Sequence, residues 1–182
     1  MTRPPVSLPF RVAALPNRKP TRFTLAPEPA ERAAMAAELG LLGLPEFSLK
    51  GELRPAGRDD FELEARMEAV VVQPCSISLV PVTTRLSESV TRRYDADYTP
   101  PDGDEVELTE DDTVDALPEV IDLGEVAMEA LALALPLYPR AEGAVIEEAV
   151  FAAPGVTPLK DEDLRPFSGL AALKAKLEGK GE

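Results

Sequence analysis

Residues 46–71 read EFSLKGELRPAGRDDFELEARMEAVV, and this stretch decides the fold class. Apolar side chains or glycine stand at every second position on both sides of a central break, with charged or polar side chains between them. Alternation with a period of two predicts β-strands that have one buried face and one wet face. The break at Arg54–Asp60 holds Pro55 and Gly57, which are typical of a turn, so the two runs predict an antiparallel hairpin.

Further strands are predicted on both sides of the hairpin. Residues 77–94 are rich in valine, threonine and serine and contain Pro81, a composition that fits either two shorter strands or one bent strand at a sheet edge. Glu119–Leu123 is predicted to return as a strand. Upstream, the pattern indicates a short strand at Arg22–Leu25.

Helix signals flank the strands. Prolines and acidic residues at Pro27–Glu31 predict a helix over about 28–39, which Gly40 would end. Ser168 is predicted to cap a short helix near the C-terminus. Asp122 and Glu125 have the spacing of a helix start, and nine of the ten residues from Val126 to Leu135 are apolar. A helix that is apolar nearly all round is expected to be buried against the sheet.

These elements predict an α+β fold. The sheet is expected to be antiparallel, either open or curled towards a barrel, with the 124–135 helix buried against it and short helices flanking it. The predicted organisation is a loose, basic, proline-rich leader over residues 1–22, a single α+β domain over 23–157 and a C-terminal tail with a short helix over 158–182.

Charge is distributed very unevenly along the 182 residues. The formal net charge is −14, and residues 95–129 hold fourteen acidic and no basic side chains, so the rest of the chain is neutral in sum. Residues 95–119 are therefore predicted to form a mobile acidic loop within the domain. Such a loop repels phosphate and attracts a basic protein.

Composition excludes several kinds of active site. The chain has no histidine, which removes Ser-His-Asp triads, Cys-His pairs and histidine metal ligands. A single cysteine, Cys75, cannot form an internal disulfide and is typical of a small core residue. No phosphate-binding glycine loop is present, and no apolar run approaches the length of a membrane span. We therefore expect a soluble cytoplasmic protein that is not an enzyme and needs no cofactor, metal or small-molecule substrate.

Candidate binding residues fall into two groups. Arginine beside tyrosine can combine a phosphate contact with base stacking, so Arg92, Arg93, Tyr94, Tyr138 and Arg140 are candidate RNA contacts. The alternative for the 92–94 triplet is a solvated strand face with one aromatic side chain packed inward. The second group comprises four acids of the loop that would face a basic partner: Asp104, Glu105, Asp111 and Asp112.

Three segments resemble the bacterial YceD family of large ribosomal RNA subunit accumulation proteins. They are QPCSISLVPV at 73–82, IDLGEVAMEALALALPLYPR at 121–140 and RPFSGLAAL at 165–173. The resemblance spans about residues 20–178 and implies a role in ribosome biogenesis, because the family is associated with 23S rRNA accumulation and with genes for a large-subunit ribosomal protein. It implies no catalytic reaction. Many members carry a second cysteine in a Cys-x-x-Cys arrangement, and Ser78 stands at that position here.

The expected function is a non-enzymatic factor that supports 23S rRNA accumulation and assembly of the large subunit. In this hypothesis the acidic loop engages a basic ribosomal protein, while Arg92, Arg93 and Arg140 contact rRNA. The alternative is a module that binds the 23S rRNA precursor directly.

Overall fold

The alternating stretch forms the hairpin that it predicts. In the computed structural model, which describes residues 4–98 and 114–145, strand β3 (Gly43–Ala56) pairs with β4 (Asp60–Pro74) in antiparallel register. Leu49 lies opposite Met67, and Leu53 lies opposite Leu63, all four with side chains at most 1% exposed. The strands run up to a tight turn at residues 57–59, where Gly57 adopts a φ of 67° that favours glycine.

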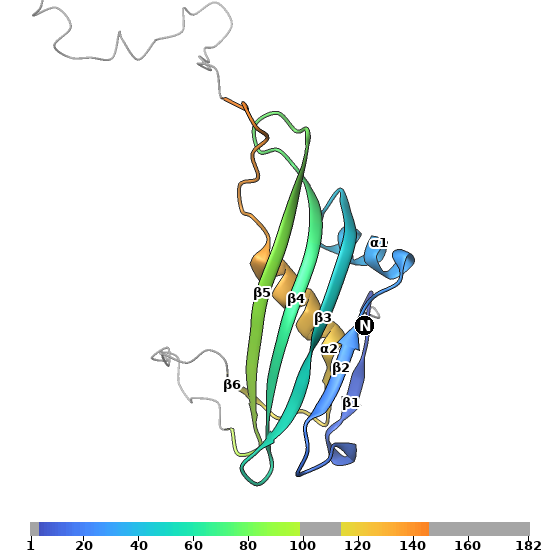
Figure 1. Cartoon of the computed structure of the whole chain (residues 1–182), viewed down its shortest axis with the longest axis vertical. Coiled ribbons are helices and arrows are strands. Elements are labelled where there is room, and N and C mark those ends of the chain that lie inside the picture. The colour runs from blue at the N-terminus through green and yellow to red at the C-terminus, as the bar shows by residue number, and fades with distance from the viewer. Residues whose placement is uncertain (1–3, 99–113, 146–182) are drawn as a thin grey trace, which may run out of the picture. The chain divides into compact units, whose positions relative to one another are not determined.

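A five-stranded sheet grows from this hairpin in the order β2-β3-β4-β5-β6 (Figure 1). Strand β2 (Thr21–Leu25) confirms the predicted short strand. Strand β5 (Pro81–Asp95) is one continuous strand that pairs with β4 along its length, so it is not divided in two. Pro81 is its first residue, where a missing N–H is tolerated.

The sheet is neither wholly antiparallel nor a barrel. Strand β6 (Val114–Ala116) runs parallel to the end of β5, and the sheet is therefore mixed and open. The predicted acidic loop thus includes strand residues at Asp95 and at 114–116, and its residues 99–113 lie outside the described part of the chain. A helix covers the apolar face of the sheet and takes the place of the opposite wall that a closed barrel would supply.

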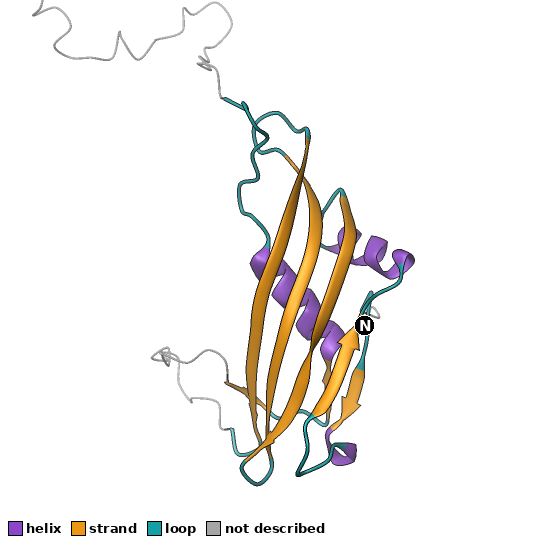
Figure 2. Cartoon of the chain, viewed as in Figure 1, coloured by secondary structure: helices purple, strands orange, loops and turns teal. Residues whose placement is uncertain are grey.

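That helix is α2 (Leu123–Ala134), which crosses one face of the three long strands (Figure 2). The side chain of Asp122 caps it by accepting from the N–H of Gly124 at 2.8 Å, as predicted. Leu123, Ala127 and Leu131 are fully buried, whereas Leu133 is 80% exposed. The predicted burial against the sheet is confirmed for one face of this helix, and the face that carries Leu133 is open to solvent.

The N-terminal segment is not loose. Strand β1 (Pro9–Arg11) pairs with β7 (Val120–Asp122) in a separate two-stranded sheet, and a 3₁₀ turn follows at Val12–Ala14. Val6 and Leu15 belong to the buried core. Prolines made this segment look unstructured, but Pro9 lies in a short edge ribbon that does not need its N–H.

The remaining predictions divide between confirmed and untested ones. Helix α1 (Pro29–Glu38) confirms the predicted helix, and the carboxylate of Glu31 accepts from the N–H of Glu28 at 2.8 Å near its start. The return strand is confirmed by β7. The domain boundaries at 22 and 157 stay predictions, and the helix expected after Ser168 lies outside the described residues.

Candidate partner-binding surface

Arg92 lies between three elements rather than on an open surface. Its Nη2 is 2.7 Å from Oε1 of Glu129 on α2, and its Nη1 is 3.2 Å from Oδ2 of Asp115 on β6. Burial disfavours the charged guanidinium, but the two carboxylates outweigh it and raise the pKa of Arg92. The guanidinium therefore links β5 to α2 and β6, and two carboxylates occupy the positions that a phosphate would need.

The next two residues of β5 point to opposite faces of the sheet. Arg93 is half-exposed and its Nη2 is 3.2 Å from Oδ2 of Asp60. The N–H of Ala96 and the charge of Arg93 lower the pKa of Asp60. Tyr94 is 4% exposed, and its burial raises the pKa of its phenol to about 12. The inward-packed aromatic, which was the alternative for this triplet, is the arrangement found.

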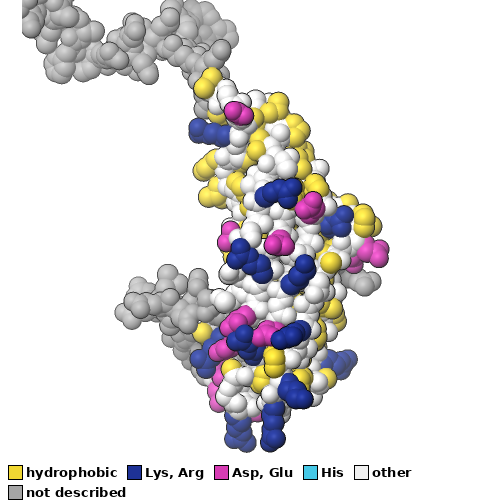
Figure 3. All heavy atoms as spheres, in the orientation of Figure 1, with side chains coloured by type: hydrophobic (Ala, Val, Ile, Leu, Met, Phe, Trp, Pro, Cys, Tyr) yellow, Lys and Arg dark blue, Asp and Glu magenta, His cyan; other side chains and the backbone are white. Residues whose placement is uncertain are grey.

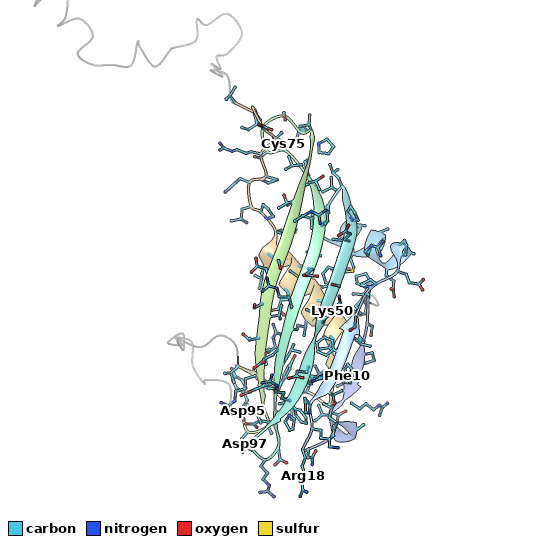
Figure 4. All side chains as sticks on the ribbon, in the orientation of Figure 1. Phe10, Arg18, Lys50, Cys75, Asp95 and Asp97 are labelled. Carbon is cyan, nitrogen blue, oxygen red and sulfur yellow. The ribbon has the colours of Figure 1, made fainter. Side chains whose placement is uncertain are left out.

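Tyr138 and Arg140 lie at the opposite end of the sheet, beside the turn that joins β4 to β5. The N–H and the hydroxyl of Ser76 both donate to the carbonyl of Pro139, at 2.8 and 3.0 Å. Tyr138 and Arg140 are themselves exposed. Figure 4 places Cys75 of that turn and Asp95 of β5 at opposite ends of the sheet, so the candidate RNA contacts do not form one site.

Exposed apolar side chains lie in the β4–β5 turn and next to Tyr138 in the sequence. They are Leu79 and Val80 in the β4–β5 turn and Leu137 beside Tyr138, with Leu137 88% exposed. Leu79 also has a φ of 60°, which is strained for a leucine. Figure 3 shows hydrophobic side chains gathered at this end of the sheet. An exposed apolar patch of this kind is typical of an interaction surface.

Cys75 stabilises the same turn through hydrogen bonds to its buried sulfur. It is fully buried, as predicted, and its Sγ accepts from the N–H groups of Ala141, Ile77 and Ser78 at 3.3, 3.4 and 3.4 Å. The N–H of Ala141 and the hydroxyl and N–H of Ser78 contribute most to a thiol pKa lowered to about 6. Neither a cation nor a helix start lowers this pKa, so the sequence pattern carried no signal for it.

We expect this thiol to make the stability of the protein depend on pH. In the unfolded chain the pKa of cysteine is about 8.5, and in the folded protein that of Cys75 is about 6. Between these values the unfolded state binds one more proton, so the free energy of unfolding rises with pH and the contribution is lost as pH falls through 6. Urea unfolding from pH 5.5 to 9 should show this rise in the wild type and a flatter profile in Cys75→Ala. A folded-state titration of thiolate absorbance with its midpoint near 8.5 would contradict the assignment.

A groove of about 510 Å³ lies between β5 and α2, and nothing in the sequence pattern pointed to it. Its β5 wall is Glu88–Arg92, and its α2 wall includes Ala130 and Leu133. Glu88 and Glu129 give it acidic side chains, and Arg92 is already paired. Helical spacing from Val126 to Leu133 could have suggested a shared face, but only the tertiary structure brings that face beside β5.

The four candidate acids Asp104, Glu105, Asp111 and Asp112 lie outside the described residues. Residues 4–98 and 114–145 contain no helix that is long and apolar enough to cross a membrane. They also contain no cluster of three or more cysteine, aspartate or glutamate side chains arranged to hold a metal ion.

Comparison with known proteins gives one match. A family model described as the large ribosomal RNA subunit accumulation protein YceD matches residues 63–174, a range that includes all three of the motif segments at 73–82, 121–140 and 165–173. No curated protein and no solved structure matches the chain.

Proposed function

The chain belongs to the YceD family of large ribosomal RNA subunit accumulation proteins, and from this membership we propose that it supports 23S rRNA accumulation and large-subunit assembly in the cytoplasm. It does so by binding and not by catalysis. The family match carries this proposal, since it covers more than half of the chain.

The partner in this proposal is a basic ribosomal protein that contacts the acidic region. The excess negative charge of the chain lies in residues 95–129, which begin at the end of β5 and end within α2. Among the described acids of this range, Asp97, Glu119, Glu125 and Glu129 are exposed. Charge of one sign on a partner surface favours fast and selective encounter with a partner of the opposite sign.

Direct binding to the 23S rRNA precursor is the second candidate function. The exposure of Tyr138 and Arg140 favours it, because a ring for stacking and a guanidinium for phosphate lie two residues apart. The ion pairs of Arg92 and Arg93 weigh against an RNA surface at the other end of the sheet. This candidate requires that the purified protein bind 23S fragments without any partner, with affinity falling as salt rises.

Neutralising the four loop acids is expected to weaken binding to the basic ribosomal protein. In the variant that combines D104N, E105Q, D111N and D112N, recovery of ribosomal proteins in a pull-down should fall roughly tenfold, because four attractive charges are lost. The ratio of 23S to 16S rRNA should fall in cells that carry this variant in place of the wild type.

A matched control removes the same amount of charge elsewhere. Glu38, Asp59, Glu62 and Glu68 are all exposed and lie outside residues 95–129, and their neutralisation should leave recovery unchanged. Equal recovery with the loop variant and the wild type would overturn the acidic region as the contact.

A further inference from the structure

Among the described residues, none pairs with the outer edge of β5 over most of its length. Strand β6 pairs only with Arg93–Asp95, whereas β4 pairs with the whole of β5 on the other side. Within residues 4–98 and 114–145, no backbone group bonds to the outer edge of residues 81–92. Figure 1 shows β5 as the outermost of the long strands, with β6 beyond its end alone. About 35 Å of this edge is therefore unpaired within the part of the chain that the structure describes.

The register identifies which residues of β5 direct their backbone outward. The N–H of Leu117, which follows β6, donates to the carbonyl of Asp95 at 2.9 Å, so Asp95 faces away from β4. The register with β4 is unbroken from Tyr94 to Pro81, and backbone direction alternates along an antiparallel strand. The N–H and C=O groups that point outward along the free edge therefore belong to Thr83, Arg85, Ser87, Ser89 and Thr91.

The groove lies directly beside this edge. Glu88, Val90 and Arg92 line it from β5, and they are the even-numbered residues that face α2. The opposite wall, on α2, is mainly apolar and consists of Val126, Ala130, Leu133 and Ala134 together with Glu129. A strand added beside residues 87–91 would direct every second side chain into this groove. Free backbone groups and a side-chain pocket at one place are the two requirements of strand addition.

Charge selects the occupant. The charged side chains that line the groove are Glu88, Arg92 and Glu129, and Arg92 is paired with Glu129 and with Asp115 of β6, so the groove is negative in sum. A second copy of the chain would carry the same net charge of −14. Residues 146–182 of the chain itself hold seven acidic and five basic side chains, so this segment also has a net negative charge and does not complement the acidic groove.

We propose that an extended, basic segment of a protein partner adds to the free edge of β5 as a strand and places alternate apolar side chains in the groove beside α2. The inference deepens the proposed function, on which it rests, by stating how the basic partner is held. Backbone hydrogen bonds along residues 83–91 supply affinity, and the groove and its acids select the segment.

The test uses the full chain and a synthetic peptide of alternating lysine and valine, blocked at both ends. Fluorescence anisotropy should show that this peptide binds. Binding should become about tenfold weaker when every second amide of the peptide is N-methylated, and also when glutamate replaces lysine. Thr91→Pro removes one outward N–H and should weaken binding about tenfold. Thr91→Val keeps that N–H and the branched shape, and should bind as the wild type does.

A second variant tests the proposal independently, in case Thr91→Pro does not fold correctly. Glu88 is exposed and has no ion pair among the described residues, so Glu88→Lys should leave the circular dichroism spectrum unchanged. The same variant should weaken binding of the lysine peptide about tenfold, because an attractive charge becomes repulsive. Glu38→Lys, on α1 and outside residues 95–129, should change binding of the lysine peptide little.

Several outcomes would overturn the proposal. They are peptide binding that is insensitive to N-methylation, to Thr91→Pro or to Glu88→Lys, and absence of binding altogether. Sedimentation that shows a dimer lost in Thr91→Pro would assign the edge to a second copy. A photo-crosslinker at Ser89 that links to residues 146–182 or to RNA would assign it to those occupants instead.

The test separates this inference from the proposed function. If the peptide does not bind but cells without the protein still have less 23S rRNA, only the strand addition is overturned. Normal 23S rRNA in cells without the protein would overturn the proposed function, whatever the peptide does.

Discussion

Leu131→Ala is expected to lower the free energy of unfolding by about 2–5 kcal/mol. Leu131 lies in the C-terminal half of α2 and is fully buried in the core cluster that α2 shares with the sheet. Truncation removes apolar contacts and leaves a cavity that the long strands cannot close without losing their register. Urea unfolding followed by circular dichroism measures the change.

The matched control is Leu133→Ala on the same helix. Leu133 is 80% exposed, so the same chemical change should alter the free energy of unfolding by no more than about 0.5 kcal/mol. The pair of variants tests which face of α2 is buried. Equal losses from both would mean that the helix is covered on both sides in solution, as its composition alone suggests.

Gly124→Ala is expected to destabilise the protein by about 1–3 kcal/mol, although alanine is normally the better helix residue. A Cβ at position 124 would lie 2.2 Å from the carbonyl oxygen of Val6 and 2.8 Å from Cα of Ser7, both of them backbone atoms. The N-terminal segment must therefore move away from the start of α2. That movement would weaken the bonds from Ser7 Oγ and the N–H of Leu8 to the carboxylate of Asp122, now 2.6 and 2.8 Å long.

Hydrogen exchange shows which part of the structure Gly124→Ala destabilises. Amides of β1 and β7 should lose protection before those of β3 and β4. Gly43→Ala in β3 is the control, since the nearest atoms to its added Cβ are 3.9 Å away and its φ is not positive. Unchanged protection of β1 in Gly124→Ala would show that the N-terminal segment does not depend on this close approach.

The sequence predicted the elements whose signal is local. Alternation at 46–71 is a property of neighbouring residues, and it identified the β3–β4 hairpin and its turn. Capping residues identified the start of α1 and the Asp122 cap of α2. Family membership was also recognisable from the sequence, because the motifs at 73–82, 121–140 and 165–173 are contiguous segments.

The candidate site was predicted less well, for a physical reason. The sequence predicts Arg92 and Arg93 as contacts for RNA because it shows their charge but not the carboxylates that face them. Glu129 lies 37 residues away from Arg92 along the chain, and Asp60 lies 33 residues away from Arg93. Such pairings depend on how distant segments pack, and no local pattern encodes them.

The sequence alone therefore determined that this protein has a strand hairpin, two helices, a concentrated negative charge and a place in its family. Only the tertiary structure decided that the N-terminal segment packs on α2, that β6 joins β5 in parallel, and that no other described strand pairs with the edge of β5 beside the groove. Local elements follow from side-chain periodicity and backbone preference. The pairing of segments as distant as Ser7 and Asp122 follows from the burial of a shared core, which exists only once the chain has folded.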